Sequence, residues 1–372
     1  MKHIKELQNL KGKKVLVRAD FNVPLGGDGV VDEHEAFRIK KGTQTIEFLR
    51  DSGAQIIILS HIGRDPEESL SPIATYLQKT DFPNLRFIPE TLPTEIAMND
   101  GDIVMLENLR SDEREVLGDV AFAEELSRYA DIYVNDAFAV SHRKHASIVG
   151  IPQYLPSYVG FQLALEIEEL HKVYVAEAHP FLFILGGAKI ETKLPLIESY
   201  LSKADTVFVA GALMNTLFYS RGDEVGVSVF DDGDYDLENV MKSDSLMLPF
   251  DVTIEKDTQS SEIELSDMAS DMKIVDIGSG SLKALSEKIK EAGLIVWNGP
   301  IGWYEGGYDH MTNAILDMLI QSNAKTVIGG GDTVSLVQKK NVEDRLTFVS
   351  TGGGAMLEYL HKGTLPGIEA LG

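Results

Sequence analysis

The sequence predicts an α/β protein with two domains, each built around a mainly parallel sheet. Short runs rich in Val, Ile and Leu recur along the chain, and each is followed by Gly, Asn, Asp or His and then by a stretch with helical spacing. Such runs are typical of buried parallel strands in βα units. Five runs occur in each half of the 372 residues, and two sets of this size indicate two sheets.

The predicted strands are all short enough to be single buried strands, and none is long enough to span a bilayer. In the first half they are Lys14–Ala19, Gln55–Ser60, Leu85–Ile88, Asp102–Leu106 and Asp131–Val134. In the second half they are Phe181–Leu185, Thr206–Ala210, Leu294–Trp297, Thr326–Ile328 and Thr347–Ser350. The stretches between them are expected to supply the helices that cover both sheets.

A helix is predicted to join the two domains. Residues 160–178 carry apolar side chains at helical intervals and several strong helix formers. This places an N-terminal domain at 1–160, a linking helix at 161–178 and a C-terminal domain at 179–359.

Two acidic segments in the second half, residues 230–239 and 257–271, are predicted to be solvated loops. Neither has the spacing of an EF-hand with its terminal Glu, so neither is expected to bind calcium.

Charge and cysteine content exclude several classes of function. The chain has no Cys, which excludes disulfides, thiolate nucleophiles and Cys-ligated metal sites. The formal net charge is −24, so the protein as a whole repels nucleic acid and anionic membranes. Any anionic ligand must therefore bind in a local basic pocket. The polar N-terminus resembles no export signal, and we expect a soluble cytoplasmic protein.

Basic side chains follow the predicted strands of the first half. Ligands bind beyond the carboxyl ends of parallel strands, and Arg binds phosphate or carboxylate with two parallel hydrogen bonds. The residues at these positions that suit an anion are Asp20, Asn22, His61, Arg64, Arg110 and Arg143, and Arg38 opens the first long helical stretch. The spacing of His61, His142 and His145 matches no familiar metal motif, so these histidines are not expected to hold a metal.

Glycines take the corresponding places in the second half. Glycines before a helix let main-chain N–H groups approach phosphate closely. The clusters are Gly186-Gly187-Ala188-Lys189 with Lys193 following, Asn298-Gly299-Pro300, Gly329-Gly330-Gly331-Asp332-Thr333 and Gly352-Gly353-Gly354. Asp332 is suited to a nucleotide-bound Mg²⁺ or to capping a helix that begins at Thr333, and both interpretations can hold together.

Several familiar catalytic motifs are absent from the sequence. It contains no Walker A loop, no Gly-x-Gly-x-x-Gly fingerprint, no Gly-x-Ser-x-Gly elbow and no His-Glu-x-x-His. Phosphoryl transfer between two oxyanions needs no base, because a carboxylate or a diphosphate is already deprotonated near neutral pH. Positioning and charge neutralisation then supply the catalysis.

A series of motifs along the chain closely resembles the phosphoglycerate kinase family. These motifs are Val-Leu-Val-Arg-Ala-Asp-Phe-Asn-Val-Pro-Leu (15–25), Ser-His-Ile-Gly-Arg (60–64), Glu-Asn-Leu-Arg (107–110), Gly-Gly-Ala-Lys (186–189), Trp-Asn-Gly-Pro (297–300), Gly-Gly-Gly-Asp-Thr (329–333) and Ser-Thr-Gly-Gly-Gly-Ala (350–355). The resemblance implies two Rossmann-like three-layer domains facing across a hinged cleft, with residues 360–372 returning to the first domain. It also implies a monomeric glycolytic kinase that transfers a phosphoryl group between 1,3-bisphosphoglycerate and ADP, giving 3-phosphoglycerate and ATP.

The resemblance also implies roles for individual residues. The residues that would bind 3-phosphoglycerate are Asp20, Phe21, Asn22, Arg38, His61, Ile62, Gly63, Arg64, Arg110 and Arg143. The residues that would bind ADP or ATP are Gly187, Lys189, Lys193, Gly211, Asn298, Pro300, Glu305, Gly330, Gly331, Asp332 and Thr333, with Asp332 on Mg²⁺ and Glu305 on the ribose. The residues that would stabilise the moving phosphoryl group are Arg38, Lys189, Gly352 and Gly353.

The sequence departs from the family pattern in three loops, at Asp65-Pro66, Ala139-Val140-Ser141 and Ser279. These departures bear on loop conformation, hinge motion and rate. Three other functions are weighed: a non-catalytic protein that closes on small anions, an acyl-phosphate kinase acting on acetate or carbamate, and an interaction protein without activity. Four convergent Arg exceed what so small an acid requires, whereas a substrate with both phosphate and carboxylate can occupy them.

Overall fold

The computed structural model describes residues 1–32 and 36–372, and the chain divides into two compact units. Unit 1 comprises residues 1–170 and 354–372, so the C-terminal segment folds with the N-terminal part of the chain. Unit 2 comprises residues 171–353.

Unit 1 is built on a six-stranded parallel sheet with the order β3-β4-β2-β1-β5-β6. Its strands are β1 (Lys14–Arg18), β2 (Gln55–Leu59), β3 (Arg86–Ile88), β4 (Ile103–Leu106), β5 (Ile132–Asn135) and β6 (Ser157–Val159). The predicted strands of the first half correspond to β1–β5, each within one residue at either end. The edge strand β6 was not predicted, because its sequence Ser-Tyr-Val contains one aliphatic residue and two of its three residues are only half-buried.

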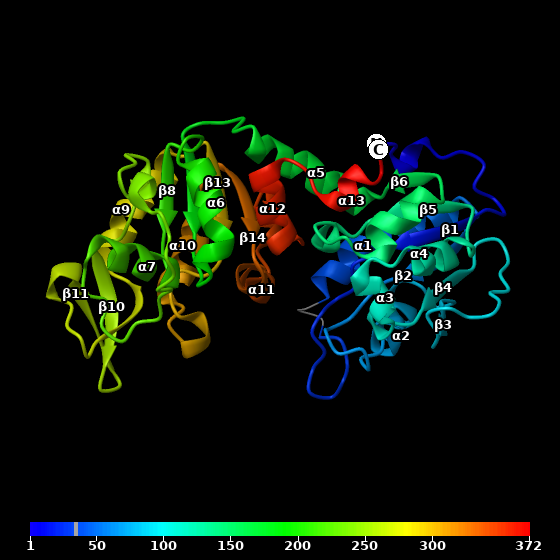
Figure 1. Cartoon of the computed structure of the whole chain (residues 1–372), viewed down its shortest axis with the longest axis horizontal. Coiled ribbons are helices and arrows are strands. Elements are labelled where there is room, and N and C mark those ends of the chain that lie inside the picture. Colours follow the sequence, from blue (N-terminus) through cyan, green and yellow to red (C-terminus); the bar gives the residue numbers. More distant parts are fainter. Residues whose placement is uncertain (33–35) are drawn as a thin grey trace. The chain divides into compact units, whose positions relative to one another are not determined.

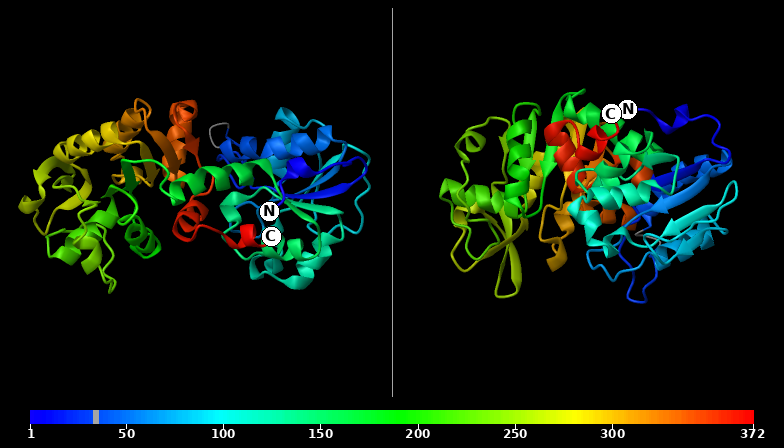
Figure 2. Two further views of the ribbon diagram at one scale, coloured as in Figure 1. Left: turned by 90° about the horizontal axis from the view of Figure 1, so that it is seen from above. Right: turned by 45° about the vertical axis from the view of Figure 1, so that its right-hand side comes forward.

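Helices cover both faces of the unit 1 sheet (Figures 1 and 2). The helices that lie wholly or partly in unit 1 are α1 (Phe37–Asp51), α2 (Ser71–Thr80), α3 (Glu113–Leu117), α4 (Val120–Ser127), α5 (Phe161–Tyr174), α12 (Gly354–Lys362) and α13 (Pro366–Glu369). Alternate residues of β1, including Val15 and Val17, pack in one apolar core with Ile46 of α1 and Leu77 of α2. The intervening Leu16 is also fully buried, as expected for a strand covered on both faces.

Unit 2 repeats this architecture with the strand order β15-β14-β13-β7-β8-β9, again parallel throughout. Its strands are β7 (Phe181–Leu185), β8 (Thr206–Val209), β9 (Leu246–Met247), β13 (Leu294–Asn298), β14 (Lys325–Gly329) and β15 (Phe348–Val349). Its helices are α6 (Ile190–Tyr200), α7 (Ala212–Arg221), α8 (Glu238–Met241), α9 (Ser279–Glu291), α10 (His310–Leu319) and α11 (Gly331–Lys340). Every residue of β7 and β13 is buried, which explains their continuous apolar sequences.

A small antiparallel sheet in unit 2 corrects the sequence prediction for residues 257–271. Strands β10 (Asp251–Lys256), β11 (Gln259–Glu264) and β12 (Lys273–Ile277) pair in the order β11-β10-β12. The predicted loop therefore contains a whole strand. Its residues are nearly all exposed and polar, so β11 lacks the apolar alternation by which strands are recognised in a sequence.

The helix predicted for residues 161–178 is shorter than expected. Helix α5 ends at Tyr174, and Ala176 has φ 51°, a left-handed conformation that the helix cannot continue through. The division between the units falls inside α5, after Leu170.

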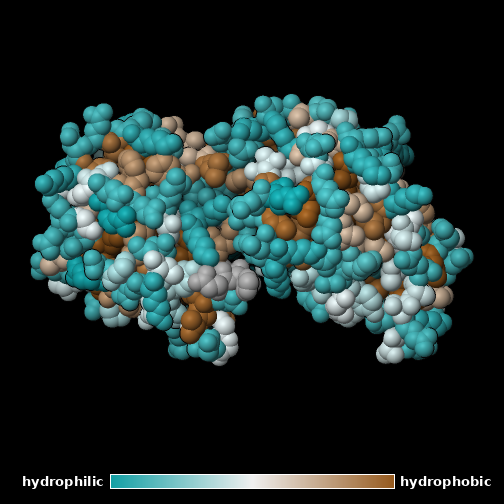
Figure 3. Space-filling view, turned by 180° about the vertical axis from the view of Figure 1, so that it is seen from behind, coloured by the Kyte–Doolittle hydropathy of each residue, from teal (hydrophilic) through white to brown (hydrophobic). Residues whose placement is uncertain are grey.

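Hydrophilic side chains cover most of the molecular face shown in Figure 3, with small apolar patches between them. Across the described parts of the chain, the helices are too short or too polar to cross a membrane.

Candidate functional site

The unit 1 residues predicted to bind an anion lie in the segments that follow β1, β2 and β4. These three strands are neighbours in a parallel sheet, so their carboxyl ends share one edge. Asp20 follows β1, His61 follows β2 and Arg110 follows β4 by a few residues, while Arg38 is the second residue of α1.

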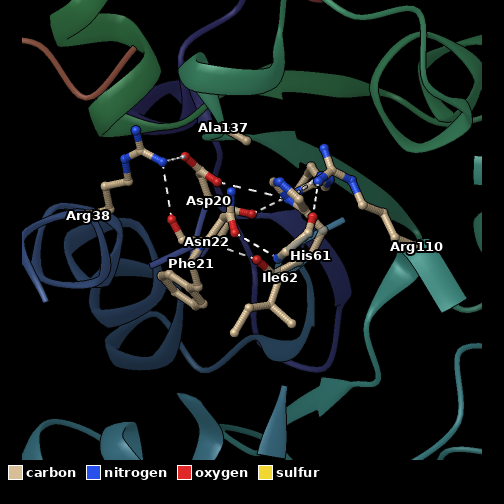
Figure 4. Close-up of polar contacts among 12 residues, drawn as sticks. Asp20, Phe21, Asn22, Arg38, His61, Ile62, Arg110 and Ala137 are labelled. Carbon is tan, nitrogen blue, oxygen red and sulfur yellow. Dashed lines mark hydrogen bonds and ion pairs between the residues drawn. The ribbon is translucent and has the colours of Figure 1, made fainter. Parts of the chain in front are cut away.

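Arg38 reaches two neighbouring residues of the loop after β1. Its Nη1 lies 3.8 Å from Oδ2 of Asp20 and donates a 3.1 Å hydrogen bond to the carbonyl oxygen of Asn22. Figure 4 shows the guanidinium turned towards both. About a third of the Arg38 side chain is exposed, so it keeps free N–H donors for a further partner.

The loop after β2 is tied to both of its neighbours. The main-chain N–H of Gly63 donates to Oδ1 of Asn22 at 2.9 Å, and Nη1 of Arg110 donates to the carbonyl oxygen of Gly63. Gly63 has φ 60°, and the carboxylate of Glu68 occupies the place that a Cβ would take. Only glycine fits this turn.

Positive charge is concentrated around His61. Burial, together with the charges of Arg18, Arg110, His145 and Arg143, lowers the pKa of His61 well below its usual range. Burial and the neighbouring Arg143 lower the pKa of Arg110 to about 10. Cations crowded in this way repel one another, so an anion bound among them would relieve the repulsion.

Two residues predicted to bind the substrate have their side chains in the hydrophobic core. Phe21 is fully buried against Gly42, and Ile62 is 2% exposed. Either can offer a ligand only main-chain atoms. By contrast, Arg64 and Arg143 are exposed, and Arg143 Nε lies 3.4 Å from Nε2 of His142.

In unit 2, glycines bring three loops into main-chain contact. The N–H of Gly187 donates to the carbonyl oxygen of Pro300 at 3.0 Å, and a Cβ at Gly186 would overlap that oxygen. A Cβ at Gly211 would lie 2.8 Å from the Gly187 nitrogen, and one at Gly330 would lie 3.1 Å from the nitrogen of Gly299. Side chains are excluded from this place, so the main chain of the three loops forms its surface.

Lys193 lies within this cradle of glycines. It is 9% exposed, and its Nζ donates to the carbonyl oxygen of Gly186. Burial lowers the pKa of Lys193 to about 8, and the charge of Asp332 opposes this shift. Oγ1 of Thr333 accepts from the N–H of Gly299 at 3.1 Å. Nδ2 of the buried Asn298 has no partner among the described residues.

The remaining predicted residues of unit 2 lie in the segments that follow β7, β13 and β15. Lys189 is the exposed residue directly before α6, and Glu305 is exposed in the 3-10 turn Tyr304–Gly306. The main-chain N–H of Gly352 donates to Oγ of Ser350 at 3.0 Å, and Gly353 follows it before α12.

The suggestion that Asp332 caps a helix beginning at Thr333 is wrong. Helix α11 begins at Gly331 and its N-cap is Gly330, with no side-chain cap. Gly330 has φ 95°, a conformation that favours glycine, and the helix begins directly after it. The start of the helix therefore lies two residues before Thr333. Asp332 therefore lies exposed in the first turn, where a carboxylate also suits the helix dipole.

Three further residues of unit 1 belong to this site and were not predicted from the sequence. Arg18, Glu115 and Ser147 are all fully buried and in contact with one another behind His61. The sequence could have indicated Arg18, because it is a charged residue directly after the apolar run Val-Leu-Val. Its partners lie far away in the sequence, and no local pattern marks them.

Comparisons with known proteins agree along the whole chain. The family model described as Phosphoglycerate kinase matches residues 4–363. A phosphoglycerate kinase of Finegoldia magna is 37% identical, with 100% of this chain and 98% of that protein covered. One of Pseudothermotoga lettingae is 38% identical, with 98% and 96% covered. The crystal structure of phosphoglycerate kinase from Pyrococcus horikoshii aligns with a TM-score of 0.86 at 27% identity, covering 100% and 98%. The structure of the Coxiella burnetii phosphoglycerate kinase gives 0.85 at 31%, covering 99% and 98%.

Proposed function

The chain belongs to the phosphoglycerate kinase family, and from this we propose that unit 1 binds the phosphoglycerate and unit 2 the nucleotide. The enzyme is an ATP:3-phosphoglycerate 1-phosphotransferase. It transfers a phosphoryl group reversibly between 1,3-bisphosphoglycerate and ADP, giving 3-phosphoglycerate and ATP.

The assignment of phosphoglycerate to unit 1 is carried by one observation. Arg38, His61 and Arg110 surround the edge of the sheet at which β1, β2 and β4 end, and the carboxylate of Asp20 lies 3.8 Å from Nη1 of Arg38 and 3.9 Å from Nδ1 of His61. A substrate with phosphate and carboxylate at opposite ends can use several separate cationic donors. The exposed Arg64 and Arg143 extend this basic surface.

The nucleotide assignment rests on the glycine cradle of unit 2. Glycines without room for a Cβ let these loops pack closely, and the Lys193 ammonium among them is a cationic group suited to phosphate. Glu305 is assigned to the ribose hydroxyls, and Lys189 and Lys193 to the phosphates.

Asp332 is assigned to a Mg²⁺ ion that enters with the nucleotide. Among the residues that the structure describes, no group of three or more His, Cys, Asp or Glu is placed to hold a metal ion by itself. A single exposed carboxylate nevertheless fits, because nucleotide-bound Mg²⁺ takes one or two carboxylates and completes its shell with phosphate oxygens and water. When bound, Mg²⁺ neutralises phosphate charge during transfer.

The mechanism needs no general base. The carboxylate of 3-phosphoglycerate is deprotonated at neutral pH, so it can attack the γ-phosphate directly. Arg38, Lys189 and the amides of Gly352 and Gly353 are assigned to the charge of the phosphoryl group in transfer. Because the two ligands bind to different units, we propose that hinge closure brings them together and excludes water.

The decisive experiment measures turnover of the purified protein with 3-phosphoglycerate, ATP and Mg²⁺. A coupled dehydrogenase reports formation of the bisphosphoglycerate, and acetate replaces 3-phosphoglycerate in the control. Turnover with 3-phosphoglycerate alone is expected. Tight nucleotide binding without turnover would contradict the proposal and favour a protein that binds anions without catalysis.

We also propose that the enzyme works as a cytoplasmic monomer. The proposed ligand contacts all come from one chain, and its phosphorylated substrates are those of glycolysis. Light scattering during size-exclusion chromatography should give the mass of one chain at assay concentration, and a dimer mass would contradict this.

A further inference from the structure

Arg18 joins His61 to a buried carboxylate through a directed set of hydrogen bonds. Arg18 is the last residue of β1 and is fully buried. Its Nε donates to Oγ of Ser147 at 2.9 Å, and that hydroxyl in turn donates to Oε1 of Glu115 at 2.6 Å. The main-chain N–H of Ser147 also donates to Oε2 of Glu115, at 2.9 Å. Ser147, itself bound to Glu115 by two hydrogen bonds, thus holds the guanidinium of Arg18 in place.

The Nη2 group of the same guanidinium contacts the imidazole of His61. Nη2 of Arg18 lies 3.1 Å from Nδ1 of His61. Arginine has only donors, so Nδ1 must accept this hydrogen bond and cannot carry a proton. A neutral imidazole with a bare Nδ1 carries its proton on Nε2. Nε2 is buried, and it has no hydrogen-bond partner in the part of the chain that the structure describes.

We infer that Arg18 is a positioning residue that fixes His61 as the Nε2–H tautomer, so that His61 offers substrate one neutral hydrogen-bond donor. The substrate part of this inference rests on the proposed function. The acceptor would be an anionic oxygen of 3-phosphoglycerate, since Nε2 is an unpartnered donor in the proposed binding site.

The other charged groups around His61 support a neutral ring. Arg110, Arg143 and His145 oppose a positive charge there, and burial acts in the same direction on the pKa of His61. Oδ1 of Asp20 lies 3.9 Å from Nδ1, beyond hydrogen-bond distance. Glu115 lies behind Arg18, with Oε1 4.0 Å from Nη2, and so faces the guanidinium.

The tautomer can be measured on the unmodified enzyme, without substrate. Long-range proton–nitrogen NMR on protein labelled with nitrogen-15 histidine distinguishes a protonated from a bare ring nitrogen, and His61→Gln identifies the signals of His61. A bare Nδ1 and a protonated Nε2 are expected at pH 7. Protonation of Nδ1, alone or together with Nε2, would overturn the inference.

Addition of 3-phosphoglycerate then tests the donor role. The Nε2–H signal should move downfield while Nδ1 stays bare. An unmoved signal in an enzyme that turns over 3-phosphoglycerate would overturn the donor role and leave the proposed function standing. The expected tautomer in a protein without turnover would refute the proposed function alone.

The variant Arg18→Met connects the tautomer to activity. It should populate the Nδ1–H form and raise KM for 3-phosphoglycerate about tenfold or more, with KM for ATP unchanged. Arg50→Met is the matched control, because Arg50 is an exposed residue of α1 paired with Asp51. A folded Arg18→Met enzyme with an unchanged tautomer would overturn the inference. Should this variant fail to fold, the wild-type spectrum still decides the tautomer.

Discussion

At the residue scale, Arg38 illustrates how an accessible cation is held ready for a ligand. Its guanidinium lies 3.8 Å from Asp20 and donates to Asn22, yet about a third of the side chain stays exposed. An arginine paired so loosely contributes little to stability. Removal of Arg38 is therefore expected to affect mainly ligand binding and phosphoryl transfer.

We expect Arg38→Ala to lower kcat by about 10²–10³-fold, because it removes a charge that stabilises the phosphoryl group in transfer. Steady-state turnover with 3-phosphoglycerate and ATP measures this. Thermal unfolding should change little, which separates loss of function from loss of fold. Arg50→Ala is the matched control on the same helix and should retain turnover. Near-normal turnover of Arg38→Ala would refute the catalytic role.

Lys193 gives a prediction for the pH dependence of nucleotide binding. Its pKa of about 8 in the free protein results from burial, and bound phosphate would favour the protonated form. Above pH 8 binding must therefore take up a proton, and ADP affinity should fall by up to about tenfold per pH unit. Below pH 8 the ammonium is already charged, and this dependence disappears.

Calorimetric titration with Mg²⁺ and ADP between about pH 7.5 and 9.5 tests the Lys193 prediction, since Lys193 titrates in this window with a pKa of about 8. The variant Lys193→Met should bind more weakly and lose the dependence on pH. An equal slope in both proteins would show that another group causes it.

Candidate site residues could be proposed from the sequence where a motif lies at a strand end, and not where a residue depends on distant partners. Arg38 opens the first long helix, and His61 and Arg110 follow the pattern of polar residues after apolar strands. Arg18 does not, because its contact with Ser147 joins residues 129 positions apart. Burial likewise decides that Phe21 packs in the core, and no local pattern shows this.

At the element scale, the first turn of α5 is hydrogen-bonded to a titratable side chain. The main-chain N–H of Leu163, near the start of α5, donates to Oδ1 of Asp136 at 3.1 Å. Asp136 directly follows β5 and is buried, and burial raises its pKa from 3.8 to about 7. The folded protein therefore binds this proton more tightly than the unfolded chain does. Between about pH 4 and 7 this contribution to stability falls as pH rises.

We expect Asp136→Asn to gain stability relative to the wild type as pH rises from 5 to 8. The amide keeps an oxygen acceptor for Leu163 and carries no charge that burial would penalise. Thermal unfolding midpoints of both proteins at the two pH values measure this. Asp119→Asn is the control, because Oδ1 of Asp119 accepts from Phe122 at the start of α4 in a half-buried position. A pH-independent difference for Asp136→Asn would contradict the raised pKa.

Strands could be predicted from the sequence where all or nearly all of their residues are buried. The central strands of both parallel sheets, such as β2, β7 and β13, are buried on two faces, so runs of apolar residues indicate them. The sheet of β10, β11 and β12 has an exposed edge, and β11 reads Gln-Ser-Ser-Glu-Ile-Glu. A sequence of this kind matches a loop equally well, and only pairing with β10 makes it a strand.

At the scale of the whole molecule, the chain carries two similar sheets with different ligand chemistry at their carboxyl edges. Unit 1 presents arginines and unit 2 presents glycines with lysines. This difference in residue types was visible in the order of motifs along the chain. Family resemblance alone implied that residues 360–372 return to the first domain, since no local pattern in α12 or α13 identifies its partner, and in the structure the returning segment begins earlier, at Gly354.

Hydrogen exchange with each ligand alone tests the proposed division of labour. We expect 3-phosphoglycerate to slow exchange at the loops after β1 and β2, around Asn22 and Gly63, because bound ligand holds main-chain groups that are otherwise open. ADP with Mg²⁺ should slow exchange around Gly187 and Gly331 and leave unit 1 unchanged. Protection of unit 1 by nucleotide alone would contradict the assignment.

Hydrogen exchange with both ligands together tests the proposed closure. Added protection is expected at Gly352 and Gly353, because closure would bring the moving phosphoryl group to their amides. Unchanged exchange at these two residues would argue against closure.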